Sequence, residues 1–313
     1  MDRRNFVKQN LKISALAGIG GLSVYPKTIM SDINILREEK EPHQFNLNYA
    51  PHLGMFQNLA GKDVIDQLNF MADQGFTAFE DNGMKDRPIE VQEKMAATMQ
   101  KRNIEMGVFV AHKIYWTSPN LTNGDKALRE EFLKEIKESV EVAKRVNAKW
   151  MTVVPGYINV RQHMQYQTAN VIESLKFAAD ILEPHDITMV LEPLNFRDHP
   201  GLFLSESPQA YQICKAVASP SCKILFDVYH QQIQEGNLLP NIEACWDEIG
   251  YFQVGDNPGR NEPTTGEINY NNVFKYIHQK GYKGIIGMEH GNSGEGEQGE
   301  LAVIEAYKVS DDF

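Results

Sequence analysis

The stretch CKILFD at residues 222–227 is a short apolar run that ends in a carboxylate. TMVLE (188–192), IGYFQ (249–253) and GIIGME (284–289) have the same form, and each ends in an acid or an amide. Apolar runs of this length, bounded by turn or helix signals, are typical of buried parallel strands. A carboxylate at the carboxyl end of such a strand is costly to bury, so it needs a partner or a metal ion.

Strand-like and helix-like segments alternate from residue 45 onward. Four more expected strands precede those above, at 45–50, 76–80, 106–111 and 150–155. Expected helices lie between the strands, near 62–74, 88–102, 126–147, 166–183, 207–217 and 271–280, with further helical segments up to Asp247. Eight such units predict an α/β fold, a (β/α)8 TIM barrel over residues 44–313. A doubly wound sheet is the alternative, but no GxGxxG follows the first strand and no P-loop is present.

The four strand-end residues are Glu192, Asp227, Gln253 and Glu289. Any one of them alone is explained as a helix cap or an ion-pair partner. On four successive strands of a barrel they converge on one point, with three anions and one neutral amide oxygen. That donor set suits a hard divalent cation such as Mn²⁺ or Mg²⁺, with Co²⁺ as an alternative. The joint placement therefore predicts a metal site.

Charge limits the partners that this chain can bind. The 313 residues carry a net charge of −11, and the first thirty hold five basic residues against one acidic, so the remainder carries −15. A chain this acidic lacks the basic surface that tracks nucleic-acid phosphates, so we expect no nucleic-acid partner. A small neutral substrate fits, or an anionic one where a metal and local arginines reverse the field. The sequence does not specify the oligomeric state, and a homo-oligomer stays open.

The N-terminal stretch RRNFVK (3–8), followed by an apolar, small-residue segment at 13–24, resembles a twin-arginine export signal. We expect residues 1–30 to be an export leader and the polar residues 31–43 to be a linker. The apolar segment is too short and glycine-rich to be a transmembrane helix, so we expect no stable membrane insertion after export. This predicts a periplasmic or otherwise exported protein, and a cytoplasmic one with an irregular N-terminus is the alternative.

Three longer motifs carry a family resemblance: LEPLNFRDHPG (191–201), FDVYHQQ (226–232) and QVGDNPGRNEPTTGEINY (253–270). They resemble the hydroxypyruvate isomerase family, within the xylose isomerase-like TIM-barrel superfamily, with the ketose 3-epimerases as near relatives. The resemblance is dense over the second half of the barrel and rests mainly on the barrel pattern before about residue 150. It implies one divalent ion held by Glu192, Asp227, Gln253 and Glu289. The glutamine follows the hydroxypyruvate isomerases, since the epimerases generally carry histidine there.

The resemblance also implies an isomerase in which Glu192 and Glu289 are the catalytic acid and base. Isomerising an α-hydroxy carbonyl moves a proton between adjacent carbons through an enediolate, so one carboxylate can remove the proton and another return it. A metal would stabilise the developing oxyanion. A ketose or keto-sugar 3-epimerase using the same carboxylates is the nearest alternative, and a non-catalytic sugar-binding barrel is a second. Phosphodiesterases of the superfamily need more strand-end histidines than this chain offers.

Four residues are expected to contact the substrate, a small sugar or a hydroxy-keto acid. His230 and Arg260 resemble family residues that reach substrate oxygens. Their structural alternatives are a supporting histidine and a salt bridge between Arg260 and Glu262. His112 and Trp116 follow the third expected strand, where the loops of a barrel build its site.

Overall fold

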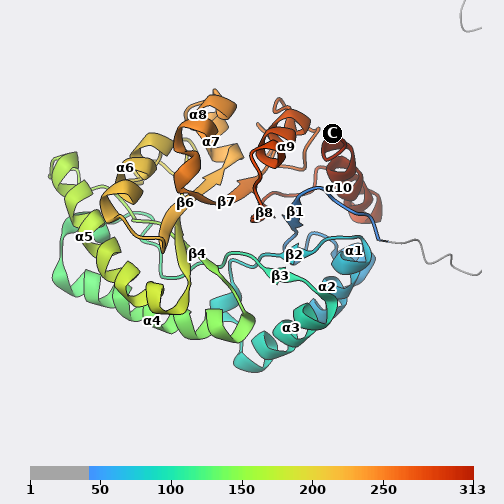
Figure 1. Cartoon of the computed structure of the whole chain (residues 1–313), viewed down its shortest axis with the longest axis horizontal. Helices are drawn as coiled ribbons and strands as arrows, with labels where there is room; N and C mark the ends of the chain where they lie inside the picture. The colour runs from blue at the N-terminus through green and yellow to red at the C-terminus, as the bar shows by residue number, and fades with distance from the viewer. Residues whose placement is uncertain (1–41) are drawn as a thin grey trace, which may run out of the picture. The chain divides into compact units, whose positions relative to one another are not determined.

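The computed structural model describes residues 42–313, in which helices surround a ring of strands (Figure 1). The expected export leader, residues 1–30, and the linker up to residue 41 lie outside the described residues. Within residues 42–313, none of the helices combines the length and the apolar character needed to cross a bilayer.

The strands form a parallel barrel in two hydrogen-bonded sets. Their bounds are β1 Asn48–Ala50, β2 Ala78–Phe79, β3 Glu105–Met106, β4 Trp150–Val153, β5 Thr188–Leu191, β6 Cys222–Asp227, β7 Ile249–Val254 and β8 Ile285–Met288. One set has the order β1-β8-β7-β6-β5-β4, and β2 pairs with β3. Single parallel bridges, His52 with Glu80 and Val110 with Thr152, join the two sets into a ring. The predicted TIM barrel is therefore confirmed.

Helices connect the strands and pack outside them (Figure 1). They are α1 Gln57–Ala60, α2 Val64–Asp73, α3 Ile89–Arg102, α4 Lys126–Val146, α5 Met164–Leu182, α6 Ser207–Val217, α7 Val228–Gln234, α8 Leu238–Cys245, α9 Tyr270–Gln279 and α10 Gly296–Ser310. Asp125 begins α4, because its side chain accepts hydrogen bonds from the first free backbone N–H groups. Asn147 ends the same helix in the left-handed conformation, with φ of 54°. Local capping thus sets the length of the connections.

The third strand differs from the expected range of 106–111, since β3 covers only Glu105–Met106. The backbone still follows the barrel wall, because Gly107 N–H donates to Phe79 O at 2.7 Å and Ala111 N–H donates to Thr152 O at 3.0 Å. The regular ladder is interrupted where the Tyr251 hydroxyl of β7 reaches across the barrel toward Gly107. A Cβ at residue 107 would lie 2.4 Å from this hydroxyl, so glycine at this position leaves room for the side chain from the opposite wall.

The barrel interior is filled by one side chain from nearly every strand. This buried cluster consists of Ala50, Ala78, Val108, Val190, Leu225, Tyr251 and Ile285, with Trp150 packed against it. A second, larger cluster lies between the strands and the helices and includes Phe109, Phe226 and Phe252. The interior is thus a packed core, and the ends of the strands are left to carry a site.

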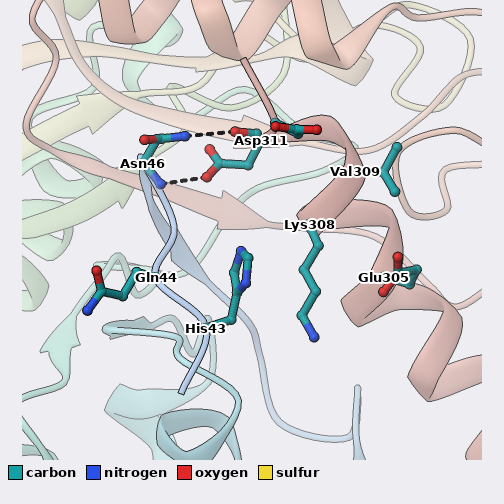
Figure 2. A pocket seen from close by; sticks show the side chains of 8 residues that line it. His43, Gln44, Asn46, Glu305, Lys308, Val309 and Asp311 are labelled. Carbon is teal, nitrogen blue, oxygen red and sulfur yellow. Dashed lines mark hydrogen bonds between the residues drawn. The ribbon is translucent and has the colours of Figure 1, made fainter. Parts of the chain in front are cut away.

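A cavity of about 400 Å³ lies at the amino-terminal end of the barrel, between residues 43–46 and the end of α10. Figure 2 shows Asn46 facing Asp311. The Asn46 backbone N–H donates to the Asp311 carboxylate, and the Asn46 side-chain amide donates to the Asp311 backbone carbonyl at 2.8 Å. Tyr49 Oη also donates to the Asp311 carboxylate at 2.8 Å. These bonds fasten the first strand to the last helix. The cavity precedes β1, so it lies at the opposite end from the strand-end acids.

Candidate active site

The strand register brings the four predicted ligands to the same end of the barrel. Asp227 lies opposite Gln253 in the β6–β7 ladder, and Gln253 lies opposite Gly287, two residues before Glu289. Glu192 directly follows β5. Asp227 is fully buried, and Glu192 and Gln253 are almost so. Three acids and an amide therefore lie together at the carboxyl ends of β5 to β8, and three of these four side chains are shielded from water.

Asp227 is held in place by the helix that it begins. Strand β6 runs directly into α7, and Asp227 Oδ1 accepts hydrogen bonds from the N–H groups of Tyr229 at 2.8 Å and His230 at 3.4 Å. The other oxygen, Oδ2, faces the site, 3.5 Å from His230 Nε2 and 3.4 Å from Arg260 Nη2. One oxygen is thus occupied by capping, which leaves the second for chemistry.

Two groups of atoms here could hold a cation. One carboxylate oxygen of Glu192, one of Asp227 and one ring nitrogen of His230 all lie within 4.8 Å of one another. The buried Oε1 of Gln253 has no hydrogen-bond partner, although its amide nitrogen is engaged. A buried acceptor without a donor is costly, and a cation would satisfy it. The donor atoms therefore fit a divalent ion.

The hydrogen bonds of Asn195 decide the role of His230 in this group. Asn195 Oδ1 accepts from the backbone N–H groups of Arg197 and Asp198, both at 3.0 Å, so its Nδ2 must face His230 Nδ1, 2.7 Å away. His230 Nδ1 is then an acceptor, and burial lowers the pKa of this histidine to about 4, so it is neutral near pH 7. With Nδ1 as the acceptor the hydrogen lies on Nε2, which points into the site 3.5 Å from Asp227 Oδ2, and the contact of Arg260 Nη2 with the same nitrogen at 3.2 Å then joins two donors.

A nitrogen that carries a hydrogen cannot ligate a metal. His230 is therefore a hydrogen-bond donor toward the site, and the oxygen atoms of Glu192, Asp227 and Gln253 remain as the donors suited to an ion. The set expected from the sequence, Glu192, Asp227, Gln253 and Glu289, stays a prediction, since the three grouped residues include His230 and not Glu289.

Glu289 is the most accessible of the four predicted ligands, with a side chain 25% exposed. Its Oε1 accepts from Asn82 Nδ2 at 3.0 Å, and its Oε2 from Arg260 Nη2 at 3.1 Å. The Arg260 guanidinium also lies over the ring of Tyr229, 4.9 Å from its centre. Glu262, the alternative partner of this arginine, instead accepts from the Ser293 backbone N–H at 2.9 Å. Arg260 thus points into the site, as a substrate contact requires.

The buried carboxylates repel one another. Burial, and then the neighbouring Glu289, raise the pKa of Glu192 well above its ordinary value. Burial also raises the pKa of Glu289, although the positive charge of Arg260 opposes this shift. The raised pKa values favour the protonated forms of these carboxyl groups, and a bound cation would favour their ionised forms. The site is therefore equipped for acid–base chemistry.

The other two predicted contacts lie in different surroundings. Burial lowers the pKa of His112 to about 4. Both of its ring nitrogens have hydrogen-bond partners, since Nε2 accepts from the Val154 N–H at 3.3 Å and Nδ1 lies 2.9 Å from Lys113 O. His112 therefore joins neighbouring strands and has no free nitrogen for a substrate. Trp116 is 47% exposed and stacks on His199, 5.3 Å between ring centres, and His199 lies 5.4 Å from His230. Trp116 thus lies at the rim of the site.

Two residues that the sequence analysis did not select also lie here. Asn82 follows β2 and binds Glu289, and Glu80 is a fully buried acid next to Gln253. Burial, and then Glu289, raise the pKa of Glu80 well above its ordinary value. Both residues line a cavity of about 310 Å³ that also contacts His52 and Glu289. FTAFE (76–80) has the same strand-then-acid form as the other four runs, so a signal for Glu80 was present.

Comparisons with known proteins agree with this architecture. The sequence model of a family described as "Xylose isomerase-like TIM barrel" matches residues 68–310. A hydroxypyruvate isomerase of Escherichia coli strain K12 is 33% identical over 194 residues, which cover 58% of this chain and 75% of that protein. A 2-oxo-tetronate isomerase of Pectobacterium atrosepticum is 27% identical over 242 residues, 75% of this chain and 89% of that protein.

Solved structures share the fold. A protein of Brucella melitensis described as an AP endonuclease of family 2 superposes with a TM-score of 0.72 at 26% identity, over 81% of this chain and 96% of the other. A D-psicose 3-epimerase of Clostridium cellulolyticum superposes with a TM-score of 0.71 at 14% identity, over 84% and 98% of the two chains. At that identity the second similarity concerns the fold alone.

Proposed function

The chain belongs to the xylose isomerase-like TIM barrel family, and we propose that it is a divalent-metal-dependent isomerase of a small α-hydroxy-carbonyl acid, similar to hydroxypyruvate isomerase. Its curated relatives are isomerases, and the enzyme is of that class. One observation carries the proposal. Two glutamates, Glu192 and Glu289, lie at the same barrel end as His230 and Arg260, with His230 Nε2 3.8 Å from Glu192 Oε1 and Arg260 Nη2 3.1 Å from Glu289 Oε2.

The reaction requires a proton to move between two adjacent carbons. One glutamate removes the proton from the hydroxyl-bearing carbon, which leaves an enediolate, and the other delivers a proton to the former carbonyl carbon. The hydroxyl proton passes to the other oxygen, so the product is the isomer with hydroxyl and carbonyl exchanged. Burial favours the protonated form of these carboxyl groups, whereas Arg260 and a bound cation would favour the ionised form, so the environment can support both forms that the transfer requires.

A divalent ion held by the oxygen atoms of Glu192, Asp227, Gln253 and Glu289 would supply positive charge beside the reacting oxygens. Two protein groups add hydrogen bonds there. His230 presents a neutral Nε2–H whose direction is fixed through Asn195. Arg260 presents a guanidinium fork, which suits the planar carboxylate of a 2-oxo acid.

The experiment is a proton NMR assay in D₂O with the full chain and Mn²⁺, using hydroxypyruvate and a panel of small ketoses. We expect each converted hydroxypyruvate to lose one of its two C3 hydrogens, and the 2-hydroxy-3-oxo isomer to appear with deuterium at C2 and the remaining hydrogen on its aldehyde carbon. Exchange at C3 of a ketose, with inversion there and no carbonyl shift, would instead identify a 3-epimerase. Exchange in neither substrate class would contradict the proposal and favour a sugar-binding barrel without activity.

A further inference from the structure

Glu80 is a buried acid to which the reaction above gives no task. It follows β2, across the barrel from β7, and is only 1% exposed. Its Oε2 accepts a hydrogen bond from Tyr251 Oη at 3.0 Å. The amide nitrogen of Gln253 donates to it as well, 3.3 Å from Oε1 and 3.5 Å from Oε2. Two side chains of β7 thus converge on one carboxyl group.

The barrel wall makes room for this group by close approach at two glycines. A Cβ on Gly287 would lie 2.0 Å from Glu80 Oε2. A Cβ on Gly107 would lie 2.4 Å from Tyr251 Oη and 3.1 Å from the Glu80 Cβ. A glycine within a strand often marks such a close approach. The position of Glu80 is therefore defined from two sides of the barrel.

Gln253 needs this support because its side chain has two different ends. A glutamine amide can rotate to present either its oxygen or its NH₂ group, and only the oxygen can bind a cation. With the nitrogen donated to Glu80, the remaining atom is Oε1, which is buried and has no partner among the described residues. The orphaned oxygen is thus left for the proposed metal site.

We propose that Glu80 is a positioning residue that holds the amide of Gln253 with its oxygen toward the metal site. This inference rests on the proposed function, because it assumes that the site binds a divalent ion. The competing explanation is that Glu80 acts only through its negative charge, which would attract a cation whatever the orientation of Gln253. The two explanations differ in whether the effect of Glu80 passes through Gln253.

A double-mutant cycle on Mn²⁺ affinity separates them. The dissociation constant is measured by the EPR signal of free Mn²⁺ during titration of the full native chain, E80A, Q253A and the double variant. Loss of a group that orients a ligand typically weakens metal binding by about 10–100-fold. We expect that loss for E80A in the native background and almost none when Gln253 is already alanine. An equal loss in both backgrounds would overturn the positioning role.

Two further variants keep the test decisive if E80A folds poorly by circular dichroism. E80Q removes the charge but keeps an acceptor oxygen for Gln253, so positioning predicts Mn²⁺ affinity within a few-fold of the native value. Charge alone predicts that E80Q binds Mn²⁺ far more weakly. Y251F is the matched control, since it removes one bond to Glu80 and leaves the Gln253 bond intact, and should change the affinity little. A native chain that binds no Mn²⁺ would refute the proposed metal site itself.

Discussion

The Asn195 side-chain nitrogen lies 2.7 Å from His230 Nδ1, and this contact determines which nitrogen of the imidazole carries the hydrogen. The asparagine cannot turn its oxygen to the ring, because that oxygen accepts two backbone hydrogen bonds from residues 197 and 198. His230 therefore enters the site as a donor through Nε2. The sequence places these two residues 35 positions apart, and only the fold brings them together.

Replacing Asn195 by aspartate should reverse the tautomer of His230. A carboxylate at this position accepts a hydrogen bond, which favours the hydrogen on Nδ1 and removes the donor from the site. We expect the ¹⁵N chemical shifts of the two His230 ring nitrogens to be exchanged. We also expect kcat/KM to fall by about 10–100-fold, which corresponds to the loss of one hydrogen bond of ~1.5–3 kcal/mol. Asn103→Asp, on an exposed residue at the end of α3, is the matched control. Unchanged ring shifts in N195D would show that Asn195 does not set the tautomer.

Arg260→Lys should weaken recognition of a substrate carboxylate more than that of a neutral substrate. Lysine keeps the charge but loses the two-pronged fork that matches a carboxylate. We expect KM for hydroxypyruvate to rise about tenfold or more, while KM for a neutral ketose that turns over changes by less than threefold. Steady-state kinetics with both substrates checks this. An equal rise for both would mean that Arg260 serves mainly to order Asp227 and Glu289.

Burial of His112 should make the protein less stable in acid. The pKa of His112 is about 4 in the folded chain, against an ordinary value of 6.5. Between these values the unfolded chain binds a proton that the folded chain does not, so stability present above pH 6.5 is lost as the pH falls toward 4. One such group contributes at most about 1.4 kcal/mol per pH unit.

Urea unfolding of H112Q from pH 7 to pH 4 tests this assignment. The variant should be less stable at pH 7, because two buried hydrogen bonds change, yet its unfolding free energy should decline less steeply with acid. His163→Gln, on an exposed histidine before α5, should retain the native slope. If H112Q and the native chain have parallel curves, His112 already takes up its proton in the folded state.

Replacing Arg3 and Arg4 by lysine should keep the protein in the cytoplasm, if the paired arginines form an export signal. Cell fractionation of the native chain and of the double variant, expressed in a bacterium with a twin-arginine pathway, measures the outcome. Replacing Lys8 and Lys12 by arginine is the control that retains the pair and the charge. A native chain that stays in the cytoplasm, or a double variant exported normally, would contradict the export proposal.

Much of the fold could be predicted from the sequence because each strand is a short buried run with a turn or a cap after it. The helices over 88–102, 126–147 and 207–217 agree with the structure to within about a residue at each end. Helix α10 was not predicted, since the stretch GEGEQGEL (294–301) around its start contains three glycines and three acids and gives only a weak apolar pattern. The third strand was predicted too long, since regular pairing covers only Glu105–Met106 and the residues after it keep single bonds to the neighbouring strands.

The site was predictable as a set of strand ends, whereas the connections among its side chains were not. The runs ending at Glu192, Asp227, Gln253 and Glu289 share one pattern, so a common barrel end followed from topology. The engagement of both His112 nitrogens depends on the backbone of the neighbouring strand, which the sequence does not specify. The hydrogen bond from the Gln253 amide to Glu80 also depends on a contact across the barrel, between residues 173 positions apart.

The central claim is that Glu192 and Glu289 transfer the proton, and deuterium incorporation from D₂O by E192Q and E289Q at saturating Mn²⁺ tests it most directly. Glutamine keeps an oxygen ligand and removes the acid–base group, so turnover should fall by about 10²–10⁴-fold in each variant. Deuterium exchange at the substrate carbon should vanish in whichever variant lacks the abstracting base. If either variant turns over within a few-fold of the native enzyme, that glutamate is only a ligand, and a relay through His230 or water becomes the better account.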